Sequence, residues 1–536
     1  MRLRPRNCPF RSNPLTSLAI LTIVVFYMFT NFLHHSWTRD GPGERGVIHW
    51  DVISYYSYLP ATFIYGDVSL GFLDNPPEGF VNDDKFWSST IENGNKLIIT
   101  SMGLSVLYAP FFFTAHVLAP IFGQATHGFS SIYQFFLVIS ALVYVTFGFV
   151  ILKNILSRYF KPLTTAITLI AIAFGTNLLY YTTFEAAMAH SYGFFLIVLF
   201  LYQVIRWYQK PDLLRTILTG AVFGFIALVR PTNILVIFIL LLWDVKSWRG
   251  LTDRILFFVK KFHLVLLMLA AFIVVWIPQF LYWKSITGHF LYFSYAAEGA
   301  SFYWAHPHIL RGLLGFKKGW FIYTPMMLLA VAGIPLLRKR IPGLFLPILL
   351  LLLSAIYVQS SWWSWWFGGG FGLRAYIDIY GLLAIPLAVV VERMVELRKK
   401  IFRYPALSII GLLLVFQLIN THQYRRNIIH YVGMNKHTYK NAFLRFDYPY
   451  DHWTSLTMPD YELARKGIYV FYYTGDQYKK LTEMERSEAL ESVRGMVNED
   501  KRLVKEIKWY AGREEMDREQ AMSEVIERMY LSMTKQ

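Results

Sequence analysis

Ionisable residues at the ends of apolar segments are the first candidates for chemistry, because charge beside a membrane interior is costly and usually serves a function. Such positions are Asp51, Glu185, His190, Arg230, Lys317, Lys318, Arg374 and Asp378. Two carboxylates, Asp51 and Glu185, together with several cations suit a transfer from an anionic leaving group. A carboxylate accepts the proton of an attacking hydroxyl, and Arg or Lys stabilises the charge that grows on a departing phosphate.

Each of these residues also has a structural interpretation. Glu185 favours a helix N-terminus, and His190 suits a packed, hydrogen-bonded position. Arg374 can reach lipid headgroups or pair with Asp378 four residues on. Asp67 is the alternative acid in the loop that holds Asp51. Lys317 and Lys318 break the charge rule for external loops, which indicates either a phosphate contact or an error in the topology.

The histidines at 289, 306 and 308 have no ligand-like spacing with partners, and the nearest approach to an Asp-X-Asp motif is His49-Trp50-Asp51. We therefore predict no metal ligands and no cofactor. A divalent metal stays compatible with the chemistry, although no clear ligand motif supports one. Cys8 is the single cysteine, so the chain has no intrachain disulfide.

The elements that position these residues are membrane helices. Hydrophobic residues make up 55% of the chain and charged residues 16%, with a mean hydropathy of +0.37, whereas soluble domains carry roughly 25% charge. The apolar residues form runs long enough to cross a hydrocarbon core about 30 Å thick. The sequence therefore predicts an all-α polytopic membrane protein.

Basic clusters between the apolar runs set the predicted topology, because cytoplasmic loops are rich in Lys and Arg. They predict a cytoplasmic N-terminus (residues 1–14), eleven crossings, an external C-terminus and a location in the cell inner (plasma) membrane. Met102–Phe122 does not fit as a crossing and is predicted to lie on the outer surface, or to form a re-entrant segment packed on protein. The predicted crossings are residues 15–33, 129–151, 163–181, 187–205, 216–229, 231–243, 263–283, 319–337, 342–359, 376–392 and 404–420.

The net charge of +17 does not indicate a nucleic acid partner. Residues 422–536 hold 19 Lys and Arg against 18 Asp and Glu, so the excess lies in residues 1–421, with 33 against 17. Positive charge in the short segments between apolar runs orients membrane helices. Anionic membrane lipids are enough to balance this charge, so it does not require a nucleic acid. The predicted organisation is a transmembrane domain (15–421) with a first external loop (34–128), followed by a small external α+β region (422–536).

The motifs resemble the C-type (GT-C) superfamily of membrane glycosyltransferases, which includes protein O-mannosyltransferases and aminoarabinose transferases. Asp51 in HWDVISYY stands where that superfamily has an essential Asp in the first external loop. The superfamily has a second acid in the turn between helices three and four, and Glu185 matches that position. The sequences GAVFGFIALVRPT, LLGFKKGWFIYTP and WWFGGGFGLRAYID are similar to bacterial members. The usual Asp-Glu pair is absent, because Val52 follows Asp51.

The resemblance implies an inverting glycosyltransferase that uses a polyprenyl-phosphate sugar and a glycan, lipid or protein acceptor on the periplasmic face. Asp51 is then the general base, Glu185 orients the acceptor or assists, and Arg374 with Lys317 or Lys318 holds the lipid phosphate. Three alternatives stay open: a lipid-linked oligosaccharide polymerase or ligase, a lipid or solute transporter, and a scaffold of an envelope assembly. Visible repeats and polar interruptions at mid-membrane, which are typical of transporters, are missing from the sequence.

Overall fold

The computed structural model describes residues 13–39, 46–77 and 86–534, and these residues form a mainly helical protein. Most of the predicted cytoplasmic segment 1–14 lies outside the described residues. By length and composition, seven described helices suit a membrane crossing, which confirms the prediction of a helical, multi-pass membrane protein. They cover Pro14–Thr38, Ser131–Leu156, Ala189–Gln209, Phe262–Thr287, Pro342–Ser361, Arg374–Val395 and Lys400–Arg425.

Four of the eleven predicted crossings correspond to helices of fewer than 18 residues. These are α6 (Pro162–Phe174), α9 (Leu213–Val229), the pair η4 (Pro231–Val236) and α10 (Ile237–Leu241), and α15 (Met326–Arg340). The count of eleven therefore stays a prediction. The segment predicted to lie on the surface forms the helix α4 (Gly103–Leu118), which carries Pro110 inside it.

The contacts divide the chain into two compact units. The first contains residues 1–298, 325–355 and 375–417, and the second contains residues 299–324, 356–374 and 418–536. The second unit thus combines the predicted C-terminal region with two earlier segments of the chain. Helices α16 (Pro342–Ser361) and α18 (Lys400–Arg425) each begin in the first unit and end in the second.

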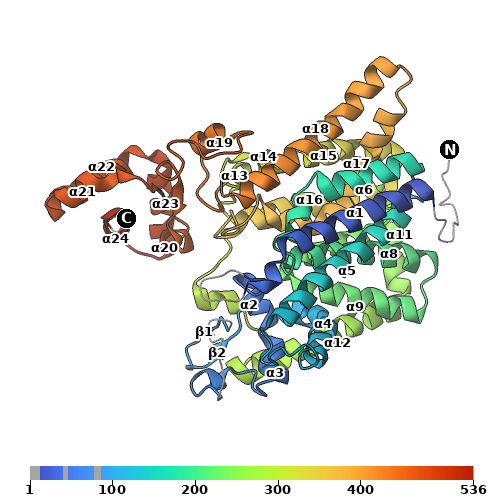
Figure 1. Ribbon diagram of the computed structural model, residues 1–536, viewed down its shortest axis with the longest axis horizontal. Coiled ribbons are helices and arrows are strands. Elements are labelled where there is room, and N and C mark those ends of the chain that lie inside the picture. Colours follow the sequence, from blue (N-terminus) through green and yellow to red (C-terminus); the bar gives the residue numbers. More distant parts are fainter. Residues whose placement is uncertain (1–12, 40–45, 78–85, 535–536) are drawn as a thin grey trace. The chain divides into compact units, whose positions relative to one another are not determined.

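The first unit is a bundle of long helices that lie side by side (Figure 1). Helices α9 and α12 approach closely, because Gly220 and Gly224 stand one turn apart on α9. A Cβ on Gly220 would lie 2.3 Å from the backbone oxygen of Met268, and the Trp276 indole donates to Gly224 O (3.1 Å). Small residues at this spacing let two membrane helices pack backbone to backbone.

The other helices and strands of the first unit are α1 (Pro14–His34), η1 (Ser36–Thr38), α2 (Asp51–Tyr56), α3 (Tyr58–Phe63), η2 (Gly71–Leu73), β1 (Ser89–Thr90), β2 (Lys96–Leu97), α5 (Ser131–Leu156), α7 (Leu178–Thr183), α8 (Ala189–Gln209), α11 (Trp248–Lys260), α12 (Phe262–Thr287), η5 (Ser294–Glu298) and α17 (Tyr380–Val395). The helix η6 (Arg374–Ile379) precedes α17. The pairs α8 with α9, α5 with α8, and α8 with α17 are in contact, so α8 lies within the bundle.

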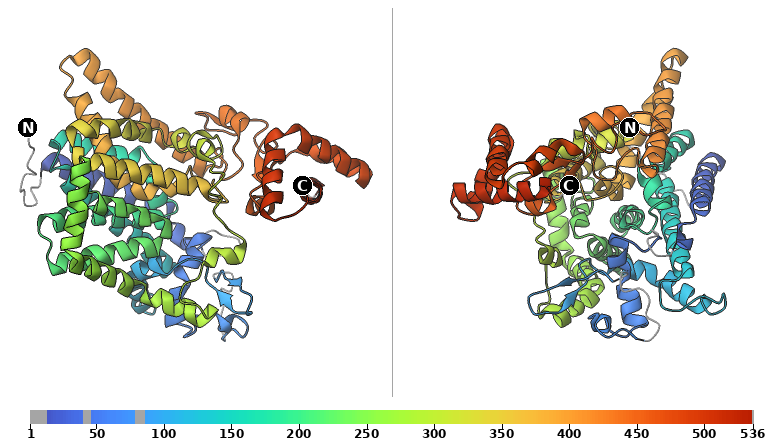
Figure 2. Two further views of the ribbon diagram at one scale, coloured as in Figure 1. Left: turned by 180° about the vertical axis from the view of Figure 1, so that it is seen from behind. Right: turned by 60° about the vertical axis from the view of Figure 1, so that its left-hand side comes forward.

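The second unit is built from short helices, a small sheet and a helical cluster, which Figure 2 shows in orange and red. Strands β3 (Thr457–Pro459) and β4 (Phe471–Tyr473) pair antiparallel, with Met458 opposite Tyr472. The remaining elements are α13 (Ile309–Leu314), α14 (Trp320–Tyr323), α19 (Lys436–Ala442), α20 (Tyr461–Arg465), η7 (Asp476–Tyr478), α21 (Lys479–Glu483), α22 (Arg486–Glu499), α23 (Lys501–Arg513) and α24 (Arg518–Thr534).

The helical end of the second unit has an apolar core of its own. On α23 the buried residues Leu503, Ile507 and Tyr510 recur at four- and three-residue intervals, which puts them on one face of a helix. They pack with Val493 of α22 and Val525 of α24. The charged residues that the sequence shows from Thr482 onward therefore cover the outside of a small amphipathic helix cluster.

Candidate active site

Asp378 is the centre of a buried polar cluster in the first unit. Its Oδ1 accepts a hydrogen bond from Nδ1 of His190 (3.0 Å) and its Oδ2 accepts one from Nδ2 of Asn233 (2.7 Å). Nη1 of Arg230 lies 3.5 Å from the same Oδ2, and the Asp378 side chain has no exposed surface. Three of the predicted site residues, His190, Arg230 and Asp378, therefore lie together.

The hydrogen-bond roles in this cluster follow from the chemistry of the carboxylate. An ionised carboxylate only accepts, so we assign the imidazole hydrogen of His190 to Nδ1. Nη1 of Arg230 also lies 3.1 Å from that nitrogen, but a protonated Nδ1 does not accept from it. The favourable partner of Arg230 is therefore the charge of Asp378. The Arg230 side chain keeps 17% of its surface exposed, whereas Asp378 has none.

A glycine on α8 makes room for the buried carboxylate. Asp378 reaches α8 from η6, and a Cβ on Gly193 would lie 2.7 Å from Cγ of Asp378. That distance is shorter than the contacts that real Cβ atoms make. Any other residue at position 193 would therefore push the carboxylate of Asp378 away from His190, which lies one turn before Gly193 on α8. Gly193 therefore belongs to the architecture of the site.

The end of α9 positions Arg230 and Asn233. Arg230 has an extended backbone (φ −149°, ψ 107°) because the following Pro231 disfavours a helical conformation in the residue before it. The chain then enters η4, where the Asn233 N–H donates to Arg230 O (2.9 Å). The predicted hinge at Arg230-Pro231 is present. The side chains of Arg230 and Asn233, on either side of this hinge, both reach Asp378.

Residues of the first external loop fix this end of α9. The hydroxyl of Ser101 donates to Leu228 O (2.5 Å), and the Met102 N–H donates to Gln279 Oε1 of α12 (2.8 Å). A Cβ on Gly103 would lie 2.5 Å from the backbone carbon of Leu228, so α4 begins in direct backbone contact with α9. The loop and the Arg230 segment are therefore one packed structure.

Asp51 is the first residue of α2 and is half-buried. The preceding Trp50 has φ 48° and ψ −134°, a conformation that costs energy in a residue with a side chain. Strained backbone of this kind clusters at functional sites. This outlier directly precedes Asp51, and the functional role of Asp51 stays a prediction.

Tyr295 joins Asp51 to the Arg230 cluster. Burial raises the pKa of the Tyr295 phenol well above its usual range, and the nearby Tyr55 and Asp51 raise it further. The positive charge of Arg230 lowers the pKa of the same phenol. Asp51 and Arg230 are therefore each close enough to the Tyr295 hydroxyl to act on it electrostatically.

Glu185 lies in the turn between α7 and α8, and its Oε1 accepts a hydrogen bond from the Tyr180 hydroxyl (3.2 Å). It precedes His190 by five residues, and the His190 ring contacts the Tyr181 ring edge-on at 4.9 Å. Glu185 is half-buried. The fold therefore places it just before the helix that carries His190, and its part in chemistry stays a prediction.

Lys317 and Lys318 lie in the second unit, where their ammonium groups bind backbone carbonyls. Nζ of Lys317 donates to Val432 O (2.8 Å) and Thr457 O (2.9 Å), and Nζ of Lys318 donates to the carbonyls of Gly370 and Tyr431. Burial lowers the pKa of Lys317 to about 7. These contacts give both lysines a structural task, and their contact with a phosphate stays a prediction.

Arg374 also belongs to the second unit. Burial raises the pKa of the Tyr461 phenol, while a hydrogen bond with Trp366 and the charge of Arg374 lower it. Arg374 is therefore close enough to Tyr461 to act on it electrostatically. Its predicted phosphate contact is likewise not tested by this geometry.

Within residues 13–39, 46–77 and 86–534, no group of three or more His, Cys, Asp and Glu side chains is placed to hold a metal ion. The absence of metal ligands, which the sequence predicts, stays a prediction.

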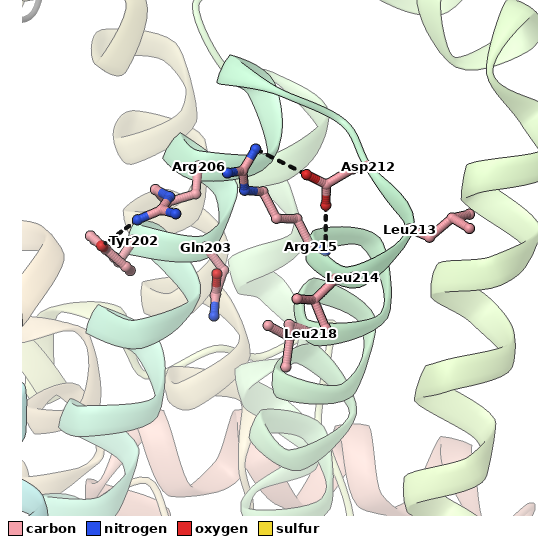
Figure 3. A pocket seen from close by; sticks show the side chains of 8 residues that line it. All are labelled: Tyr202, Gln203, Arg206, Asp212, Leu213, Leu214, Arg215 and Leu218. Carbon is pink, nitrogen blue, oxygen red and sulfur yellow. Dashed lines mark hydrogen bonds and ion pairs between the residues drawn. The ribbon is translucent and has the colours of Figure 1, made fainter. Parts of the chain in front are cut away.

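A cavity of about 600 Å³ opens elsewhere in the first unit, between the ends of α8 and α9 (Figure 3). No predicted site residue lines it. Arg206, on its wall, follows His190 by 16 residues on α8, which corresponds to about 24 Å along the helix axis. The cavity is lined by Tyr202, Gln203, Arg206, Asp212, Leu213, Leu214, Arg215 and Leu218.

Sequence reasoning missed three residues of the site. Asn233 carries no charge, Gly193 has no side chain, and Tyr295 is one tyrosine among 35. The position of Asn233 just after the predicted Arg230-Pro231 hinge was a usable signal. Nothing in the sequence singles out Gly193 or Tyr295, because their importance comes from neighbours that are distant in the chain.

No family model and no curated protein matches the chain. Among solved structures, it is similar to the archaeal oligosaccharyltransferase AglB from Archaeoglobus fulgidus in complex with an inhibitory peptide and a dolichol-phosphate. That match has 11% identity and a TM-score of 0.44, and it covers 81% of this chain and 60% of AglB. The apo form of the Archaeoglobus fulgidus oligosaccharyltransferase matches with 12% identity and a TM-score of 0.38, over 92% of this chain and 59% of that one.

The chain thus spans about 60% of the length of these solved structures. Both TM-scores are below 0.5, so the likeness alone assigns neither the fold nor the function of this chain.

Proposed function

We propose that the chain is an inverting membrane glycosyltransferase that moves a sugar from a polyprenyl-phosphate donor to an acceptor hydroxyl on the periplasmic face. The observation that carries the proposal is that one unit holds both the half-buried Asp51 at the start of α2 and Arg230, which lies 3.5 Å from the buried Asp378, with Tyr295 near each of them. A proton acceptor and an anion-stabilising guanidinium are the two groups that such a transfer requires. The motif resemblance of the first external loop supports the same chemistry.

Asp51 acts as the general base. Its carboxylate accepts the proton of the acceptor hydroxyl while the oxygen attacks the anomeric carbon from the face opposite the phosphate. The bond between that carbon and the phosphate oxygen breaks, and the electron pair leaves with the polyprenyl phosphate. The new glycoside has the inverted configuration. Asp51 is half-exposed, which fits a base that must meet an incoming hydroxyl.

Arg230 stabilises the negative charge of the departing phosphate. Asp378, which is fully buried and 3.5 Å away, orients the guanidinium, and His190 and Asn233 hold Asp378 in turn. These three are positioning residues in this proposal. A fixed guanidinium is effective because it needs no reorganisation as charge develops.

The remaining predicted residues have supporting roles. Glu185 orients the acceptor or assists as a second base. The contact of Arg374, Lys317 or Lys318 with the lipid phosphate stays a prediction, and the carbonyl contacts of the two lysines favour Arg230 for that task. Acceptors of the glycan, lipid or protein class fit the mechanism equally, and no step requires a metal.

The test uses the full chain in nanodiscs with synthetic polyprenyl-phosphate-linked ¹⁴C-hexoses, together with an acceptor extract from the source envelope. Labelled glycoside and released polyprenyl phosphate are measured together. We expect Asp51→Asn to abolish both products while the unfolding temperature stays unchanged.

Asp67→Asn is the matched control in the same loop. Asp67 accepts hydrogen bonds from the N–H groups of Ser69 and Gly71 (both 2.8 Å), so its role is to form a turn, and the variant should keep transferring sugar. A fully active Asp51→Asn protein would disprove the assignment. Labelled lipid that crosses the bilayer of a vesicle without forming any glycoside would indicate a transporter.

A further inference from the structure

We propose that the cavity between the ends of α8 and α9 binds one anionic phospholipid, with the headgroup phosphate on Arg206 and Arg215 and an acyl chain along the leucines of α9. This site is independent of the proposed transfer chemistry. None of the residues assigned to that chemistry lines the cavity, which lies at the opposite end of α8 from His190.

The polar wall of the cavity carries two guanidinium groups. Arg206 comes from the last turn of α8 and donates to the Tyr202 hydroxyl (3.0 Å), which is a neutral partner. Arg215 donates to Lys210 O (3.0 Å) and lies 3.2 Å from Oδ2 of Asp212. Asp212 offsets one of the two positive charges, so the lining keeps a net positive charge that suits a phosphodiester.

A third guanidinium lies beside the same wall. Cζ of Arg158, in the turn after α5, is 5.8 Å from the centroid of the Tyr202 ring, and Cζ of Arg206 is 5.7 Å from it. Both arginines therefore lie over the ring of Tyr202, which lines the cavity. Guanidinium groups suit phosphate because they offer paired N–H donors.

The other wall is apolar and exposed. Leu213 and Leu214, at the start of α9, keep 64% and 67% of their surface, and Leu218 one turn on keeps 39%. Figure 3 shows the arginines on the α8 side and at the turn, with Leu214 and Leu218 along α9. A charged rim above an apolar helix face matches an amphipathic ligand with a phosphate and a hydrocarbon chain.

The position of the cavity favours a membrane lipid over a soluble ligand. It lies at the Arg206–Arg215 cluster, which the charge pattern predicts to face the cytoplasm, where the leaflet holds anionic lipids. Basic pockets between membrane helices on this side suit anionic headgroups. A volume of about 600 Å³ holds a headgroup with the first part of an acyl chain.

The test is native mass spectrometry of the full chain, released from detergent after titration with dioleoyl-phosphatidylglycerol or dioleoyl-phosphatidylcholine. We expect one retained phosphatidylglycerol in the wild type and about tenfold weaker retention in Arg206→Gln, which corresponds to about 1.4 kcal/mol. Arg249→Gln is the matched control, because Arg249 is an exposed residue of the basic segment on α11. It should retain the lipid as the wild type does.

A second variant tests the contribution of the apolar wall apart from that of the arginines. Leu214→Gln should weaken retention of phosphatidylglycerol without changing the unfolding temperature, because it removes only exposed apolar surface. Equal retention of the two lipids, or wild-type retention by Arg206→Gln, would overturn the proposal. Displacement of the lipid by millimolar inorganic phosphate would identify a site for a free anion, which also overturns it.

Discussion

The two units stabilise buried positive charge in different ways. In the first unit, Arg230 is paired with the carboxylate of Asp378, which His190 and Asn233 also bind. In the second unit, Lys317 is surrounded by the carbonyls of Val432 and Thr457 and by the ring of Phe471, 4.5 Å away. A side-chain network holds the first cation, and the backbone holds the second.

This difference bears on the proposed function. The Arg230 side chain, paired with a carboxylate, is still 17% exposed. An ammonium group that serves two carbonyls of a folded loop has little left for a ligand. Charge near a membrane surface is therefore a functional signal only when the partners leave part of it accessible.

The largest effect is expected from removing the carboxylate of the first unit. Asp378→Ala leaves Arg230 and His190 without their charged acceptor, and breaking a buried pair in this way costs about 3–5 kcal/mol. We expect a clear fall in the thermal unfolding midpoint of the detergent-solubilised chain and the loss of sugar transfer.

Glu396→Ala is the control for this substitution, since it removes an exposed partner 2.9 Å from Lys161. It should change neither measurement. If Asp378→Ala unfolds at the wild-type temperature and keeps its activity, the carboxylate is not the centre of the first unit's network.

The second-largest expected effect is a difference between the Arg230 and Lys317 variants in kcat/KM for the donor lipid. Arg230→Gln removes the guanidinium from the departing phosphate and should lower kcat/KM by about 10²–10³-fold, the usual effect of losing one such donor. Lys317→Met should leave kcat/KM for the donor near that of the wild type.

The readout is the initial rate of transfer at several donor concentrations. An equal loss in Lys317→Met would mean that the lysine also contacts the lipid phosphate, and the contrast between the two units would fail. Lys508→Met, an exposed position on α23 of the second unit, controls for loss of a positive charge in general.

The smallest effect is a pH dependence in the second unit. Burial, with Arg311, Arg502 and His306 nearby, lowers the pKa of His308 from 6.5 to about 3. Between these values the unfolded chain binds a proton that the folded chain does not, so the free energy of unfolding falls as the pH falls from 6.5 toward 3.

Thermal unfolding measured between pH 4 and 7 tests this dependence. His308→Gln should show a shallower slope than the wild type, whereas His289→Gln, at an exposed position of the first unit, should keep the wild-type slope. Identical slopes in all three proteins would contradict a neutral, buried His308.

The sequence by itself determined the class of the protein and several local features. Apolar runs of membrane length define helices because the bilayer thickness sets their size. Arg230-Pro231 predicts the break between α9 and η4 because proline restricts the residue before it. Asp51 and Asp378 were visible as charges beside apolar segments, since such charges are rare.

Only the tertiary structure decided which charges meet. His190 and Asn233 precede Asp378 by 188 and 145 residues, and no local pattern records a contact over such a distance. Gly193 matters because a Cβ would collide with Asp378, and Tyr295 matters because Asp51 and Arg230 both act on it. Helix formation depends on neighbours three or four residues apart, whereas this site depends on how separate helices pack.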